Sequence, residues 1–270
     1  GRAEAWPPPG ARRWAARRGR GVAGCHCHLS RGRDAEMLAT IEKQAADDPD
    51  DLPELSRRVG RKEAAVRRTL AGLLADLRER TALEALAKAS ETGDVNVIER
   101  VVPVAAWAET LIEPCRTFLR DAYLVGSRYG AETAGLTAQR AEPDDTFNVA
   151  NAEAVTWAQQ HAATLVTGVT ESTREGIRAA ITEALERGWS PRKTARAIRE
   201  GLGLTAQQAR AVVRFANRLA EQDEFLPDDK LFARVGRYSE AQRRVRALTI
   251  SRTELIAASG AGQQRLWDLA

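Results

Sequence analysis

Apolar residues recur every three or four positions through most of the second half of the chain. Stripes of this kind run through residues 149–168, 173–187 and 205–219, and again from Ser239 toward the C-terminus. A period of 3.6 residues places such side chains on one face of a helix. The pattern therefore predicts a series of amphipathic helices in this half of the chain.

Helix start signals divide this region further. Ser190 followed by Pro191 is typical of an N-cap and the first helical position. Two further pairs match the capping box, namely Thr205 with Gln208 and Ser239 with Gln242. We expect helices to begin at all three places.

The first half of the chain is also helical in pattern. We expect a short and a longer helix within 52–77, separated at Gly60, and further helices near 81–91, 104–112 and 115–134. The polar stretch "AEPDD" (141–145) marks a boundary between an N-terminal helical region, 37–145, and a second helical domain, 146–270. No alternating strand pattern of useful length occurs, so we predict an all-α, multi-helix array with long helices and no significant sheet.

Residues 1–36 differ from the remainder in composition. They carry eight arginines against three acidic residues and mix Pro and Gly without periodicity. Such a segment does not repay the entropy of ordering, so we expect a disordered basic tail. Two interpretations stay open: natural translation starts at Met37, the only methionine, or the tail is an arm that contacts nucleic-acid phosphates.

Metal, cofactor and membrane functions find little support in the sequence. "CHCH" (25–28) lacks the distant second ligand pair that structural zinc usually takes, so we expect no metal and no cofactor. No apolar run approaches the length of a membrane span, and we expect no membrane partner. The chain is expected in the cytosol or in a particle assembled there.

The run "ALTISRTELIAASGAG" (247–262) is small and apolar except for Arg252 and Glu254. Two residues turn a helix by about 200°, so these charges point to opposite sides and cannot pair with each other. We expect the helix to be buried all round and each charge to have its own partner. The small residues Ser259, Gly260, Ala261 and Gly262 predict a second backbone close by.

This final stretch resembles the bacteriophage minor head protein family, the Mu F-like head-morphogenesis proteins. The resemblance lies in "ALTISRTELIAASGAGQQRLWDLA" (247–270), where Arg252, Thr253 and Glu254 match a family tetrad and Ser251 stands where alanine is more usual. Upstream, 154–219 is similar in the order of its motifs, including "GLTAQQARAV". Family members usually continue into a further small unit beyond the point where this sequence ends.

The resemblance implies a virion protein that associates with portal or major capsid protein during head morphogenesis and DNA packaging, and that is oligomeric in the particle. We expect a structural role for Arg252, Thr253 and Glu254. His161, the only histidine in the helical region, is expected to be a satisfied or exposed side chain, and no catalytic motif occurs. We therefore expect a protein without enzymatic activity.

Two groups of basic residues are candidates for contact with packaged DNA or with an acidic portal surface. They are Arg57, Arg58, Arg61, Lys62, Arg67 and Arg68 in one segment, and Arg192, Arg196 and Arg199 in another. An alternative function is sequence-specific DNA binding by a helix-turn-helix unit in 52–77 or 190–215. For the second unit the recognition helix would be 206–218, where Gln207, Gln208, Arg210, Arg214 and Asn217 could face the bases.

Overall fold

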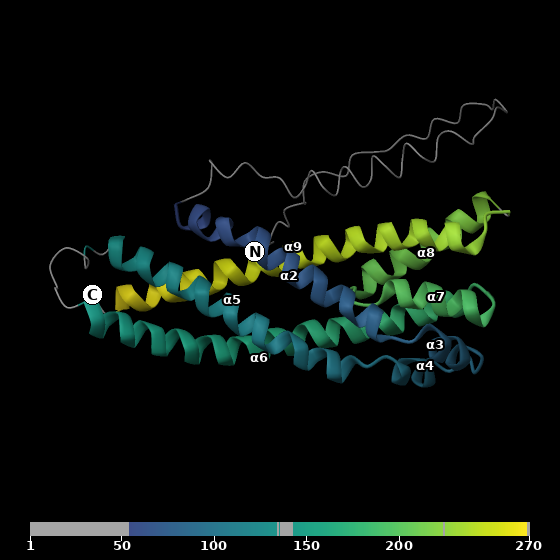
Figure 1. Ribbon diagram of the computed structural model, residues 1–270, viewed down its shortest axis with the longest axis horizontal. Helices are drawn as coiled ribbons and strands as arrows, with labels where there is room; N and C mark the ends of the chain where they lie inside the picture. Colours follow the sequence, from purple (N-terminus) through teal and green to yellow (C-terminus); the bar gives the residue numbers. More distant parts are fainter. Residues whose placement is uncertain (1–53, 134, 136–142, 224, 269–270) are drawn as a thin grey trace, which may run out of the picture. The chain divides into compact units, whose positions relative to one another are not determined.

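A computed structural model describes residues 54–133, 135, 143–223 and 225–268 of the chain (Figure 1). This part contains eight helices and no strand, which confirms the predicted all-α fold. None of the described helices combines the length and apolar composition needed to cross a membrane. The predictions for the tail at 1–36, for Met37 and for the "CHCH" segment concern residues outside the described ones.

The helices follow one another with short connections. They are α2 (Glu54–Arg80), α3 (Leu83–Ser90), α4 (Val95–Val101), α5 (Val104–Thr133), α6 (Pro143–Leu185), α7 (Pro191–Gly201), α8 (Ala206–Gln222) and α9 (Asp228–Asp268). The starts of α7 and α8 confirm the sequence signals. Ser190 accepts a hydrogen bond from the backbone of Lys193, and Thr205 with Gln208 forms the complete capping box.

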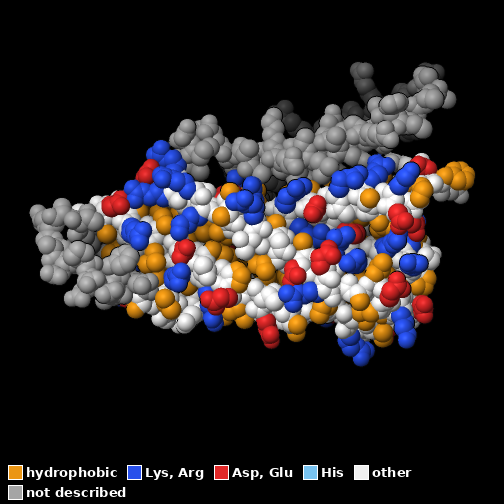
Figure 2. Space-filling view, viewed as in Figure 1, with side chains coloured by type: hydrophobic (Ala, Val, Ile, Leu, Met, Phe, Trp, Pro, Cys, Tyr) orange, Lys and Arg blue, Asp and Glu red, His pale blue; other side chains and the backbone are white. Residues whose placement is uncertain are grey.

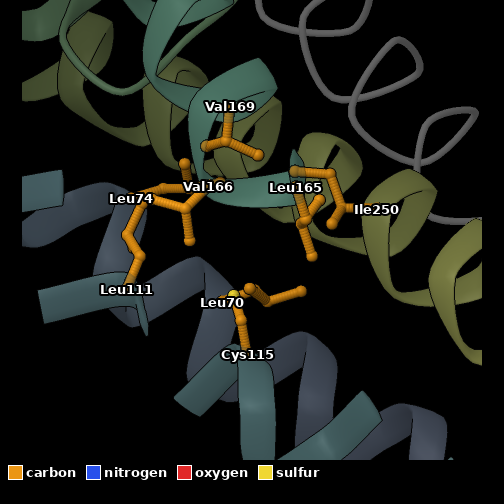
Figure 3. A pocket seen from close by; sticks show the side chains of 8 residues that line it. All are labelled: Leu70, Leu74, Leu111, Cys115, Leu165, Val166, Val169 and Ile250. Carbon is orange, nitrogen blue, oxygen red and sulfur yellow. The ribbon is translucent and has the colours of Figure 1, made fainter. Parts of the chain in front are cut away.

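Four long helices, α2, α5, α6 and α9, contribute side chains to a common apolar core. Figure 3 shows a small cavity of about 10 Å³ where they meet, lined only by apolar side chains. The lining residues are Leu70 and Leu74 of α2, Leu111 and Cys115 of α5, Leu165, Val166 and Val169 of α6, and Ile250 of α9. Because no polar side chain lines this cavity, a water molecule would find no hydrogen-bond partner there, and we expect the cavity to be dry.

The helices on either side of the predicted boundary at 141–145 pack against each other. Helix α5 contacts both α6 and α9, and α2 contacts α9. The shorter helices α3 and α7 pack together near one end, and α8 packs on α6 and α9 (Figure 1). The regions expected before and after the boundary therefore share one core.

Several predicted helix breaks are wrong. Gly60 lies inside α2, Pro114 lies inside α5, and the stretches 149–168 and 173–187 form one helix, α6. In each case a buried face continues across the break. The gain from packing exceeds the intrinsic cost, which is about 1 kcal/mol for glycine and about 3 kcal/mol for proline inside a helix. The helix start predicted at Ser239 is also wrong, because α9 begins at Asp228. The Ser239 hydroxyl does not cap a helix; it donates to the carbonyl of Glu200.

Helices α5 and α9 cross with their backbones almost in contact. A Cβ added to Gly126 would lie 1.8 Å from the carbonyl oxygen of Ser259, and one added to Gly262 would lie 2.1 Å from that of Tyr123. The Ser127 hydroxyl donates to the Gly262 carbonyl at 3.3 Å. This crossing confirms the expectation of a close second backbone at Ser259 and Gly262. Gly260, by contrast, is exposed, and a Cβ added there would have no neighbour within 4 Å.

Burial of Cys115 leads to a prediction about alkaline stability. Desolvation raises the pKa of this thiol from 9.0 to about 12. Between these pH values only the unfolded chain loses the proton, so the thiol contributes stability below pH 9 that is lost as the pH rises toward 12. We expect the free energy of unfolding to fall more steeply in the native protein than in Cys115→Ala, by about 1 kcal/mol per pH unit.

Urea titrations of both proteins at pH 8 and at pH 10 measure this difference. Equal pH dependence of the two proteins would contradict the prediction.

Candidate functional site

Arg252, Thr253 and Glu254 of α9 form the motif identified in the sequence, and its two charged residues dock α9 onto two different helices. The Arg252 Nε atom donates to Glu63 Oε2 of α2 at 3.0 Å. Glu254 Oε2 lies 2.8 Å from His161 Nε2 of α6. This confirms the prediction that the two charges have separate partners, and each pair is half-buried.

His161 belongs to a small aromatic group on α6. Its ring stacks on that of Trp157 with centroids 4.5 Å apart, and Trp157 in turn lies 5.5 Å from the ring of Tyr123 on α5. These contacts hold the imidazole in the orientation that meets Glu254. The histidine is therefore a packed and hydrogen-bonded partner of the motif, which links α5, α6 and α9.

The final helix is buried on one side only, so the expectation that it is enclosed all round is wrong. Ser251, Leu255 and Gly262 lie on its buried face, with Arg252 and Glu254 at the two edges of that face. On the outer face Thr253 is exposed, as are Ile256 at 58% and Trp267 at 48%. The small residues on this helix serve close packing on one side and leave an open surface on the other.

Two arginines of α9 that sequence reasoning missed are among the most buried polar residues. Arg243 is 2% exposed and Arg246 is 5% exposed. Burial lowers the pKa of each guanidinium to about 10. Both groups therefore remain charged at neutral pH and must be satisfied inside the protein.

These two arginines hold the end of α7. Arg243 donates to the carbonyls of Leu202 at 3.0 Å and Glu200 at 2.9 Å, and Arg246 donates to that of Gly203 at 3.0 Å. The last carbonyls of a helix carry partial negative charge and lack partners within the helix. The positive charges of α9 are therefore placed where they stabilise this helix end.

Arg246 also connects α7 to α6. It donates to the Val169 carbonyl at 3.1 Å and to the hydroxyls of Ser172 at 2.6 Å and Thr173 at 3.0 Å. No carboxylate of the described residues is among these acceptors. One buried side chain thus joins three helices through neutral groups.

The basic residues of α2 do not form an uninterrupted charged surface. Arg57 and Arg58 pair with Glu54, Arg58 also pairs with Glu132 of α5, and Lys62 lies 3.5 Å from Asp121. Arg61 and Arg68 are exposed, and Arg67 is half-buried. Figure 2 shows Lys and Arg side chains interspersed with Asp and Glu over the visible face.

The second basic group lies elsewhere. Arg196 pairs with Asp229 at 2.9 Å, while Arg199 donates to the Arg78 carbonyl at the end of α2. Arg192 is exposed and lies 3.8 Å from Glu84. Arg58 and Arg78 are twenty residues apart on one helix, which corresponds to about 30 Å, so the structure does not bring the two basic groups together.

The two helix-turn-helix candidates differ in geometry. Residues 54–80 form one unbroken helix, so the turn expected at Gly60 is wrong. Helices α7 and α8 are separate helices joined by a short turn, as the second candidate requires. Several side chains of its expected reading face bind within the protein, however: Gln208 to the Gln242 carbonyl, Arg214 to Glu183, and Asn217 to Glu221.

The chemistry available at the motif is that of docking. Among the described residues no group of three or more His, Cys, Asp or Glu side chains is placed to hold a metal ion. The thiol nearest the motif, Cys115, has a raised pKa and is buried, so it is a poor nucleophile. The motif residues and their partners instead fix how α2, α6 and α9 pack.

A double-mutant cycle tests this docking role. We expect Arg252→Met and Glu63→Gln to show a coupling free energy of about 1 kcal/mol, because the pair is half-buried and joins distant helices. The exposed pair of Arg57 and Glu54 provides the matched control, with an expected coupling of about 0.3 kcal/mol. Urea midpoints and m values of the single and double variants give both quantities, and equal coupling in the two cycles would contradict a special role for Arg252.

Comparison with known proteins adds no further information, since no protein family, curated protein or solved structure matches this chain.

Proposed function

We propose that this chain is a non-enzymatic structural protein of a tailed-phage or prophage head, which associates with portal and capsid during head assembly and DNA packaging. It would be assembled in the host cytoplasm and be oligomeric in the particle. The proposal starts from the resemblance of 149–270 to the minor head proteins. It concerns binding between proteins, with non-specific contact to packaged DNA through the basic residues of α2 and α7.

The observation that supports it most is the use of the motif within the fold. Arg252 and Glu254 each bind a side chain of another helix, Glu63 on α2 and His161 on α6. Docking of this kind accounts for the two opposite charges on α9 without assigning them a catalytic role. This arrangement favours a building block over an enzyme.

A second observation concerns the outer face of α9. Its exposed positions from Thr253 to Gln264 carry no charge and include Ile256, Ala257 and Gly260, and Trp267 follows one turn later. Uncharged surfaces with exposed large apolar side chains are typical of contacts with other proteins. We assign the contact with portal or capsid to this face of α9.

Co-sedimentation with assembled portal rings and with capsids, using proteins encoded beside this chain, tests the proposal. We expect the native chain to sediment with one of them and Ile256→Glu to remain in the supernatant, because a charge would be buried in the contact. Gln207→Glu, at a position on α8 that is also exposed, serves as the control and should sediment normally.

Three results would contradict the proposal. They are a chain that stays monomeric and ignores both assemblies, equal sedimentation of the two variants, or tight binding to one DNA sequence that survives added salt, which is the behaviour of a regulator.

A further inference from the structure

A cleft bordered by charged and apolar side chains lies where the end of α2, the helix α7 and the first turns of α9 meet. Its volume is about 300 Å³, at the lower limit of the roughly 300–1,000 Å³ typical of small-molecule sites. Arg78, Arg196 and Arg199 line it together with the carboxylates of Glu200 and Asp229, and Leu83, Phe232 and Ala233 supply apolar surface. Three guanidinium groups from two helices thus border one small volume.

The counter-ions of these arginines differ in how firmly they are held. Glu200 is buried and accepts from Arg78 Nε at 3.0 Å and Nη2 at 2.8 Å. By contrast, Asp229, the partner of Arg196, is 88% exposed, and Glu79, which lies 3.6 Å from Arg199, is 60% exposed. Exposed pairs contribute about 0–1 kcal/mol, so an incoming anion can replace these two carboxylates at little cost.

The number and type of the cations favour a phosphate over a carboxylate ligand. A carboxylate offers two oxygens and one charge, which a single arginine satisfies. A phosphate ester offers three oxygens and up to two charges, which suit several guanidinium groups approaching from different directions. Arg196 and Arg199, one turn apart on α7, provide two of these groups, and both are only about a quarter exposed.

The apolar part of the lining indicates an organic group attached to the phosphate. Phe232 already carries the guanidinium of Arg196 over its ring, at 5.6 Å from the centroid, and with Leu83 it offers an apolar surface beside the cations.

We propose that this cleft binds an organic phosphate of about nucleotide size, with the phosphate at Arg196 and Arg199 and the organic part between Phe232, Leu83 and Glu200. A free nucleotide and the phosphorylated end of a nucleic-acid strand share this chemistry. The site is separate from the outer face of α9 and does not depend on the proposed role in head assembly.

Isothermal titration of the full chain with deoxynucleoside monophosphates and with inorganic phosphate tests the proposal. We expect a monophosphate to bind, and inorganic phosphate to bind at least about tenfold more weakly because it lacks the organic part. The variant Arg196→Gln/Arg199→Gln should weaken monophosphate binding by a similar factor. The control Arg116→Gln/Arg120→Gln removes the same charge from exposed positions on α5, outside the cleft, and should keep the native affinity.

A second variant tests the cleft in case Arg196→Gln/Arg199→Gln does not fold. Ala233 is exposed and lines the cleft, so Ala233→Asp should repel the phosphate without disturbing the core. Short oligonucleotides with and without a 5′-phosphate distinguish the source: preference for the phosphorylated strand over the free nucleotide identifies a strand end, and the reverse identifies a nucleotide.

The proposal is overturned if no monophosphate binds, if the control variant loses as much affinity as the cleft variants, or if an acidic peptide binds more tightly than the phosphates.

Discussion

Replacing Gly126 by alanine is expected to lower the free energy of unfolding by about 3 kcal/mol, an unusually large effect for one methyl group. The added Cβ would lie 1.8 Å from the backbone carbonyl oxygen of Ser259. Because this oxygen belongs to the backbone of α9, no side-chain rotation can relieve the clash. The two helices must separate, and the contacts around Ser127 and Gly262 separate with them.

The same substitution elsewhere in the protein supplies the control. Gly72 is exposed in α2, and a Cβ there would have no neighbour within 4 Å. Gly72→Ala should therefore raise the free energy of unfolding by about 0.5–1 kcal/mol through its helix propensity alone. Urea unfolding followed by circular dichroism measures both changes, and a shift of the same sign in the two variants would show that α5 and α9 are farther apart than described.

Replacing Arg246 by methionine is expected to cost about 3 kcal/mol. The change replaces a buried cation by an apolar side chain of similar length. It leaves the Gly203 carbonyl and the hydroxyl oxygens of Ser172 and Thr173 without this donor, while the Val169 carbonyl still accepts from those two hydroxyls. Each buried acceptor that loses its partner costs about 1–3 kcal/mol, partly offset by the better burial of methionine. Thermal and urea unfolding of the variant measure the loss.

Two further substitutions separate charge from geometry at this site. Arg246→Lys keeps the charge but loses the planar fork that reaches four acceptors, so it should remain clearly destabilised. Arg237→Met on the exposed side of the same helix should change stability by less than about 0.5 kcal/mol. If Arg246→Met behaves like Arg237→Met, the clamp on α7 contributes nothing to folding.

Local signals in the sequence were sufficient to predict part of this structure. The Thr205 capping box and the Ser190 cap are interactions between neighbours, and they form as expected. The positions of Arg252 and Glu254 on different sides of one helix follow from helical geometry alone. Their partners, Glu63 and His161, do not, because they are brought close only by tertiary packing.

The errors have a common physical origin. Gly60, Pro114 and the cap at Ser239 were interpreted from local propensity, which tertiary packing outweighs in long helices. The buried arginines were missed because "QRRVR" resembles a solvated face. A signal was present, since Arg243 and Arg246 fall on the same helical stripe as Val235 and Ser239.

The crossing of α5 and α9 also determines how the two helices are aligned along their axes. Gly126 faces Ser259, and Gly130, one turn later, faces the backbone of Gln263. Sliding α9 by one turn would bring either Ala258 or Leu266 into the place of Gly262, where any Cβ would lie 2.1 Å from the Tyr123 carbonyl oxygen. Slipped pairings of these helices are therefore sterically excluded, and the chain reaches a single alignment without needing a charged pair to select it.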